Sequence, residues 1–163
     1  MGGRLPPFRG YMRSSKFNVD KDISKRAYEG ITFDSVLEMK YYRDVVCPLK
    51  ESGDIVYCEL QKPYELQPKF EHDGFNVQSI KYVADFFIVY KDGREEVVDT
   101  KGYADTTAIM KRKMFWYHYP DVTYKWICYS AIDGGWVDYE LVKKARAARK
   151  LAKKKKEEQE NTL

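Results

Sequence analysis

The sequence predicts an α/β domain in which helices cover a mixed β-sheet. Ser79–Tyr90 is rich in Tyr, Val, Phe and Ile, and a short turn separates it from a returning strand at Glu95–Lys101. A helical segment follows and leads to a further strand at Thr123–Tyr129. Because a strand–helix–strand crossover joins parallel strands, we expect the hairpin to be antiparallel and the last pair to be parallel.

Two helices flank these strands along the chain. Residues 34–47 are expected to form the first, because Ser35-x-x-Glu38 fits a capping box at its start. The second begins at a cap on Asp105 or Thr106 and runs to about Tyr119, where Pro120 stops it.

The segment between the first helix and the hairpin carries two short β-like runs, Ile55–Leu60 and Tyr64–Phe70. Pro63 lies between them and cannot donate a ladder hydrogen bond. The sequence therefore predicts two short strands rather than one continuous central strand.

Charge and composition divide the chain into three parts. Residues 1–30 are expected to be a flexible basic arm, 31–135 the core, and 136–163 a basic helix with a frayed tail. The net charge is only +4, but residues 143–156 contain Lys and Arg without any acid. Three widely spaced cysteines and the lack of a long apolar run indicate a soluble cytoplasmic protein with no membrane association.

The residues that carry chemistry are acidic side chains on inward faces. Asp99 and Lys101 alternate along one strand, so they share a face about 7 Å apart. Asp85 interrupts an otherwise apolar face in a strand whose two faces are formed by alternate residues, and Glu38 lies within the apolar arc of the first helix. Buried carboxylates need a partner or a metal, so these positions indicate a site.

The turn that follows the strand Ser79–Tyr90 decides whether this site can form. A two-residue Asp92-Gly93 turn would set Asp85 opposite Thr100 and away from Asp99. A three-residue loop ending in a left-handed Gly93 would restore the offset. The site therefore predicts an irregular hairpin here.

Three carboxylates and a lysine suit the hydrolysis of a phosphodiester. Mg²⁺ prefers oxygen ligands and keeps waters, one of which can supply the nucleophile. Asp85 and Asp99 would be the main ligands, Glu38 would bind directly or through water, and Lys101 would stabilise developing charge or orient the water. Mn²⁺ is expected to substitute for Mg²⁺.

Further basic and aromatic residues are candidates for contact with DNA phosphates. In the second helix, Lys113 and Tyr117 are expected on the packed side near the rim of the site, with Lys111 beside them. The basic C-terminal helix would grip the DNA backbone with Lys143, Arg146, Lys150, Lys153 and Lys154.

The order of these motifs resembles the PD-(D/E)XK nuclease superfamily, which has a restriction-endonuclease-like αβββαβ core. Four segments in order look like a small phage-encoded branch, an uncharacterised domain family similar to Holliday-junction and recombination endonucleases. These segments are Phe33-Asp34-Ser35-x-x-Glu38, Leu66-Gln67-Pro68-x-Phe70, Tyr82-Val83-Ala84-Asp85-Phe86 and Val98-Asp99-Thr100-Lys101-Gly102. Ala84 stands where the superfamily usually has Pro.

The resemblance implies a Mg²⁺-dependent endonuclease that acts on branched DNA in the host cytoplasm. Glu38, Asp85, Asp99 and Lys101 would be its catalytic residues, and the backbone carbonyl of Thr100 would join the metal ligands. Because a junction has two strands to cut, a homodimer is expected. Phage recombination or replication proteins are the partners that the resemblance suggests, and the nuclease subunits of heteromeric transposases have a similar motif order.

Each feature also has a simpler interpretation. Asp99 and Lys101 could be a surface ion pair, Asp85 could cap a turn or pair with an Arg, and Glu38 could only complete the capping box. The C-terminal helix could be a solvated face, or dock by its Leu and Ala stripe. As a whole, the chain could be a non-catalytic DNA- or partner-binding module, or a nuclease subunit active only within a larger complex.

Overall fold

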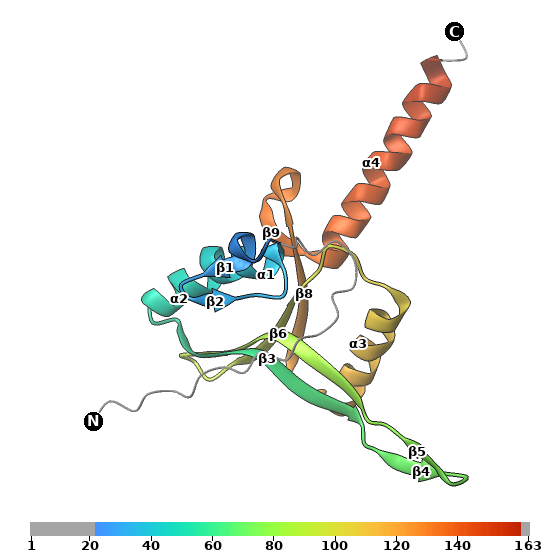
Figure 1. Ribbon diagram of the computed structural model, residues 1–163. Helices are drawn as coiled ribbons and strands as arrows, with labels where there is room; N and C mark the ends of the chain where they lie inside the picture. The colour runs from blue at the N-terminus through green and yellow to red at the C-terminus, as the bar shows by residue number, and fades with distance from the viewer. Residues whose placement is uncertain (1–21, 161–163) are drawn as a thin grey trace.

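A five-stranded mixed sheet forms the centre of the molecule in the computed structural model, which describes residues 22–160 (Figure 1). The strand order is β3-β6-β7-β8-β9. The strands are β3 (Ile55–Gln67), β6 (Ile80–Tyr90), β7 (Glu95–Thr100), β8 (Thr123–Ser130) and β9 (Gly135–Asp138). β7 and β8 are parallel and the other neighbours are antiparallel, which confirms the predicted crossover.

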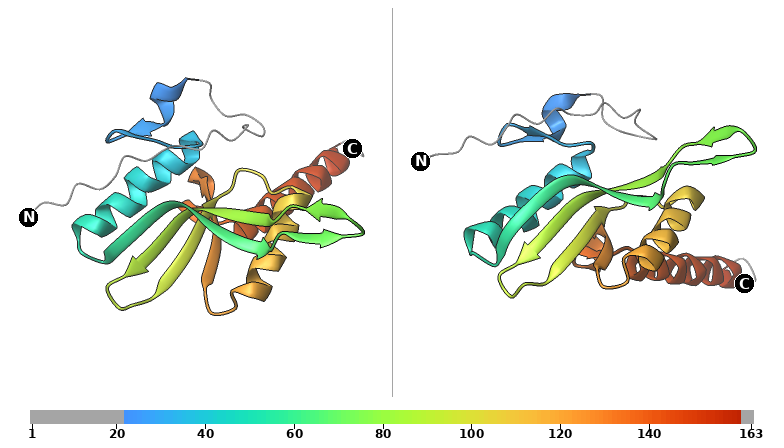
Figure 2. Two further views of the ribbon diagram at one scale, coloured as in Figure 1. Left: turned by 60° about the horizontal axis from the view of Figure 1, so that its bottom comes forward. Right: turned by 90° about the horizontal axis from the view of Figure 1, so that it is seen from below.

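Helices pack on both faces of the sheet, so the α/β class is confirmed (Figure 2). One face carries a continuous helical segment made of α1 (Val36–Tyr41), the π-helical turn η2 (Tyr42–Val46) and α2 (Cys47–Glu51). The other face carries α3 (Thr106–His118) and the first turns of α4 (Tyr139–Glu160). None of the helices within residues 22–160 is long and apolar enough to cross a membrane.

Two clusters of buried side chains hold these layers together. On the α1 face, Phe86, Ile88 and Val98 pack under Tyr41 and Val46. On the α3 face, Phe115 of α3 is fully buried among the rings of Tyr64, Tyr82, Tyr119 and Tyr124, at centroid distances of 4.8–5.4 Å. Edge-on and tilted contacts of this kind favour one orientation for each ring.

The hairpin between β6 and β7 has the predicted three-residue loop. Gly93 is left-handed with φ 84°, and the Tyr90 N–H donates to the Arg94 carbonyl at 2.9 Å. Phe86 is consequently paired with Val98, and the next positions along the two strands are Asp85 and Asp99. The loop therefore brings the two carboxylates together, as the site requires.

The prediction of two short strands around Pro63 is wrong. β3 is one strand of 13 residues from Ile55 to Gln67. Pro63 is tolerated because β3 is the edge of the sheet, and the outer side of an edge strand has no partner that needs its N–H groups. Gln61 has φ 55°, and this irregularity lies where β3 passes the site residues of β6.

The predicted alternation of faces along β6 is also wrong beyond Ala84. Ala84 and Phe87 lie in the α3-side cluster, whereas Phe86 and Ile88 lie in the α1-side cluster. A strict alternation would place Ala84 and Phe86 together. The strand therefore changes phase next to Asp85, which lies opposite Gln61 of β3 and beside the end of the β6–β7 ladder.

Several short elements were absent from the sequence interpretation. A 3₁₀ turn η1 (Ile23–Arg26) and the strand β1 (Ala27–Tyr28) lie within the expected arm, and β1 pairs with β2 (Ile31–Thr32) before α1 begins. The rest of the arm, residues 1–21, and the tail at 161–163 lie outside the described residues. The other unpredicted elements are the projecting hairpin of β4 (Phe70–His72) and β5 (Phe75–Val77), the 3₁₀ turn η3 (Ala131–Asp133) and β9.

Candidate active site

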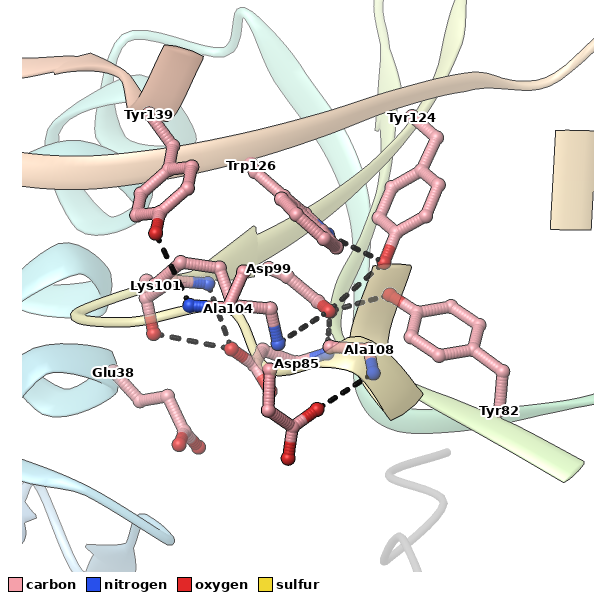
Figure 3. Close-up of polar contacts among 12 residues, drawn as sticks. Glu38, Tyr82, Asp85, Asp99, Lys101, Ala104, Ala108, Tyr124, Trp126 and Tyr139 are labelled. Carbon is pink, nitrogen blue, oxygen red and sulfur yellow. Dashed lines mark hydrogen bonds and ion pairs between the residues drawn. The ribbon is translucent and has the colours of Figure 1, made fainter. Parts of the chain in front are cut away.

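Four side chains from three elements and one strand end converge beside the point where β6 and β7 separate (Figure 3). Glu38 comes from α1, Asp85 from β6, Asp99 from β7, and Lys101 follows the last residue of β7. The β6–β7 ladder ends at the Phe86–Val98 pair. Beyond it, the Asp85 N–H donates to Asp99 Oδ1 at 3.2 Å, and the Thr100 N–H donates to Asp85 Oδ2 at 2.8 Å.

Glu38 is buried, with 7% of its surface exposed. Its carboxylate accepts hydrogen bonds from the Ser35 hydroxyl at 2.9 Å and from the Asp34 N–H and the Gln61 amide at 3.3 Å. Burial, helped by the charges of Asp34 and Asp99 and opposed by the Ser35 hydrogen bond, raises the pKa of Glu38 to about 7. The capping-box interpretation and the inward-facing prediction therefore both hold for this residue.

Asp85 has one oxygen engaged within the site. Oδ2 accepts from the Thr100 N–H and from the Thr100 hydroxyl at 3.0 Å. Burial, then the charge of Glu38 and then that of Asp99, raise the pKa of Asp85 well above its ordinary value. Glu38 is the charge that raises the pKa of Asp85 most, so its carboxyl lies close enough to oppose the ionisation of Asp85.

Asp99 is the most deeply buried acid of the site, with 2% of its surface exposed. Oδ1 accepts from the Tyr82 hydroxyl and the Asp85 N–H, and Oδ2 accepts from the Tyr124 hydroxyl at 3.0 Å. Lys101 Nζ lies 2.9 Å from Oδ2. The simple interpretation of a surface ion pair is thus half right, since the pair exists but its acid is buried.

Lys101 lies among all three carboxylates. Burial alone would lower its pKa, but the charges of Asp99, Asp85 and Glu38 outweigh burial and raise the pKa above its ordinary value. The ammonium is therefore held in its charged form beside the acids. A charged lysine in this place can contact a phosphate oxygen or stabilise a developing negative charge.

The carboxylate oxygens of the site are the kind of ligand that a hard divalent cation prefers. Glu38 and Asp85 are crowded carboxylates whose ionisation is disfavoured without a counter-charge, and a divalent ion would relieve that repulsion. Within residues 22–160, no three His, Cys, Asp or Glu side chains are already arranged to hold a metal ion. Both oxygens of Asp99 face hydroxyl, amide and ammonium donors instead.

Tyr82, Tyr124 and Gln61 contact the site acids and were missed by the sequence interpretation. Both tyrosines were visible as inward residues of strong strands, and a buried Tyr hydroxyl requires a hydrogen-bond partner. That requirement was the available signal. The sequence carries no such signal for Gln61, because its approach to Glu38 depends on its positive φ in β3.

The predicted packing of Lys113 and Tyr117 is wrong. Both are exposed, Tyr117 to 82%, and the packed side of α3 is formed by Phe115, with Ala108 and Met114 beside it. The phase of the helix is set by the fit of Phe115 among the tyrosine rings rather than by Ile109. Lys111 lies at the edge of this face and donates to the Lys81 carbonyl at 2.8 Å.

The basic residues predicted to grip DNA lie on the projecting helix α4 (Figure 1). Asp138 caps its start by accepting from the Glu140 and Leu141 N–H groups, and Arg149 forms a two-pronged ion pair with Asp133 at 2.7 and 3.0 Å. Beyond Val142 the helix is almost wholly exposed. The exposed basic residues include Lys143, Arg146, Lys150, Lys153 and Lys154.

Comparison with known proteins places the chain in one family. None of the curated proteins compared with it matches. A family model described as "Protein of unknown function (DUF1064)" matches residues 14–133, which include all four converging side chains and more than half of the chain. The protein therefore belongs to the DUF1064 family.

Proposed function

We propose that this protein is a metal-dependent DNA endonuclease. The observation that carries the proposal is the convergence of Glu38, Asp85 and Asp99 with Lys101 where β6 and β7 separate. The element order α1, β3, β6, β7, α3, β8 supports it, because it matches the αβββαβ core of the PD-(D/E)XK superfamily. Strand ends of a rigid sheet are suitable places to hold reacting groups.

Asp85 and Glu38 would hold the cation, and Asp99 with the Thr100 carbonyl remain predicted ligands from the resemblance. The bound ion would polarise the phosphate and lower the pKa of a coordinated water. Lys101 would bind a non-bridging oxygen of the scissile phosphate with its ammonium. Asp99 keeps that ammonium charged and directed toward the site through its 2.9 Å ion pair.

The DNA backbone would be bound mainly by α4. Residues 143–156 carry nine Lys and Arg side chains without an acid, on a helix that leaves the body of the domain. Such contacts hold phosphates irrespective of sequence and weaken steeply with salt. The compact domain supports a preference for DNA structure over sequence, and a homodimer would supply the two sites that a four-way junction needs.

Cleavage of end-labelled four-way junction, fork and linear duplex tests the proposal. Wild type and Asp99→Ala are incubated with Mg²⁺, with Mn²⁺, and with a chelator. Metal-dependent cuts by wild type that Asp99→Ala does not make would support the nuclease, and the preferred substrate would define its class. Tight binding without cleavage in either metal would contradict it.

A non-catalytic DNA-binding module is the second candidate. It is favoured by the absence of a preassembled three-ligand group among the described residues and by the full engagement of Asp99. The same experiment separates the two functions, because a binding module would retain affinity for the junction in Asp99→Ala and cut nothing in wild type.

A further inference from the structure

We infer that Tyr82 and Tyr124 are positioning residues of this site, which orient Asp99 and through it the Lys101 ammonium. The inference rests on the proposed function and extends it to two buried hydroxyls on the α3 side of the sheet. Tyr82 and Tyr124 come from β6 and β8, and both donate to the Asp99 carboxylate, one to each oxygen (Figure 3).

The direction of the Tyr124 hydrogen bond is fixed by its other neighbour. The Trp126 indole N–H donates to the Tyr124 oxygen at 2.8 Å. An indole nitrogen can only donate, so the Tyr124 oxygen accepts there and its own proton is directed to Asp99 Oδ2 at 3.0 Å. Since Lys101 Nζ contacts the same oxygen at 2.9 Å, the tyrosine and the lysine share one acceptor.

The two rings are fixed by packing as well as by hydrogen bonds. The Tyr82 and Tyr124 centroids lie 5.2 Å apart, and the fully buried Phe115 ring lies 5.4 and 4.8 Å from them. Tyr82 is 6% exposed and Tyr124 9%. Neither ring can rotate without disturbing the packing of Phe115, which holds α3 on the sheet. The Asp99 carboxylate therefore faces two hydroxyl donors in fixed positions.

These contacts do more than satisfy a buried acid. Asp99 already receives the Asp85 N–H and the Lys101 ammonium, so it would keep two partners without either phenol. The phenols select one rotation of the carboxylate, in which Oδ2 faces Lys101. Removing a hydroxyl leaves the acid paired but lets it rotate, and the ammonium loses its fixed place. Partners of this kind commonly change metal affinity or activity by 10- to 100-fold.

The chain offers a matched control in Tyr64. It belongs to the same aromatic cluster, with centroids 6.1 Å from Tyr82 and 4.9 Å from Phe115, and is 8% exposed. Among the described residues, no hydrogen bond joins the Tyr64 hydroxyl to Asp99. Tyr64→Phe therefore removes a hydroxyl from the cluster without touching the acid.

The test compares Tyr82→Phe, Tyr124→Phe and Tyr64→Phe by steady-state cleavage of the preferred DNA, each alone and combined with Lys101→Ala. We expect the first two to lower kcat about 10- to 100-fold at unchanged KM, and Tyr64→Phe to leave kcat within about twofold. In the Lys101→Ala background, Tyr124→Phe should have little further effect, because both act through one oxygen. Equal effects of all three variants, or full additivity with Lys101→Ala, would overturn the inference.

A second readout does not depend on cleavage. The rate at which an amine-reactive acylating reagent labels Lys101, followed by peptide mass spectrometry, should rise severalfold in Tyr82→Phe and Tyr124→Phe but not in Tyr64→Phe. If wild type cuts no DNA while this pattern is found, the proposed nuclease fails and the positioning role stands. Unchanged labelling in all three variants would overturn the positioning role even in an active nuclease.

Discussion

Glu38→Gln should make the metal-free protein more stable at pH 8 but leave its stability nearly unchanged at pH 5. Burial raises the pKa of Glu38 from 4.5 to about 7 in the folded protein. A carboxyl whose folded pKa lies above its unfolded pKa stabilises the fold fully below pH 4.5, and this contribution disappears as the pH rises through about 7. Between those limits the wild type should lose roughly 3 kcal/mol from this one group.

The glutamine removes the titration but also one acceptor oxygen. Three hydrogen bonds reach the Glu38 carboxylate, and the amide can accept them only on its remaining oxygen. A lost hydrogen bond of this kind costs about 1 kcal/mol at any pH. At pH 5 the unfolded carboxyl is already mostly ionised, which costs the wild type about 0.8 kcal/mol. The variant should therefore be about as stable as wild type at pH 5 and about 2 kcal/mol more stable at pH 8.

Urea unfolding with a chelator at pH 5 and pH 8 measures both differences, with the exposed Glu71→Gln as the control. Loss of the Glu38 charge also relieves Asp85, and that effect has the same sign. An equal change in unfolding free energy at both pH values would show that Glu38 does not titrate with a raised pKa in the folded protein. A gain in stability together with lost cleavage would identify Glu38 as a residue kept for function rather than for folding.

Three further predictions concern the loop, the core and the basic helix. Gly93→Ala should lower the unfolding free energy by about 1 kcal/mol, because Ala at φ 84° is strained, and circular dichroism melting checks it; an unchanged melting temperature would contradict the left-handed loop. Phe115→Ala should cost about 3–5 kcal/mol in urea unfolding, since the ring is fully buried, and a loss below 1 kcal/mol would contradict its central place in the α3-side core. Replacement of Lys153–Lys156 by Gln should weaken DNA binding without abolishing cleavage, and reduce the slope of log affinity against log salt by up to about 3.6. Unchanged affinity at low salt would place the DNA grip elsewhere.

The parts of the site that the sequence predicted are those where local geometry leaves few choices. The period of the first helix fixed Glu38 inward, and the need to bring Asp85 to Asp99 predicted the three-residue loop that Gly93 forms. The crossover through α3 predicted the parallel pair of β7 and β8. Each inference depends on short-range spacing, which a sequence carries directly.

The errors come from features that depend on the neighbours of a strand or helix. Pro63 argues against a continuous strand only when both edges are paired, and the edge position of β3 is a property of the whole sheet. The change of phase beside Asp85 occurs opposite the positive-φ residue Gln61 of a neighbouring strand, and the phase of α3 follows from the packing of Phe115. The same tertiary packing brings Tyr124, distant in sequence, to Asp99.

In the proposed function, Asp85, with Glu38 beside it, serves metal-dependent phosphodiester cleavage. The most direct test of this role is the cleavage rate of a labelled four-way junction with Mg²⁺, measured for wild type, Asp85→Asn and the exposed control Asp121→Asn. We expect cleavage by wild type and Asp121→Asn that a chelator stops, and a loss of at least about 100-fold in Asp85→Asn. Cleavage by Asp85→Asn at the wild-type rate, or cleavage that persists in the chelator, would contradict it.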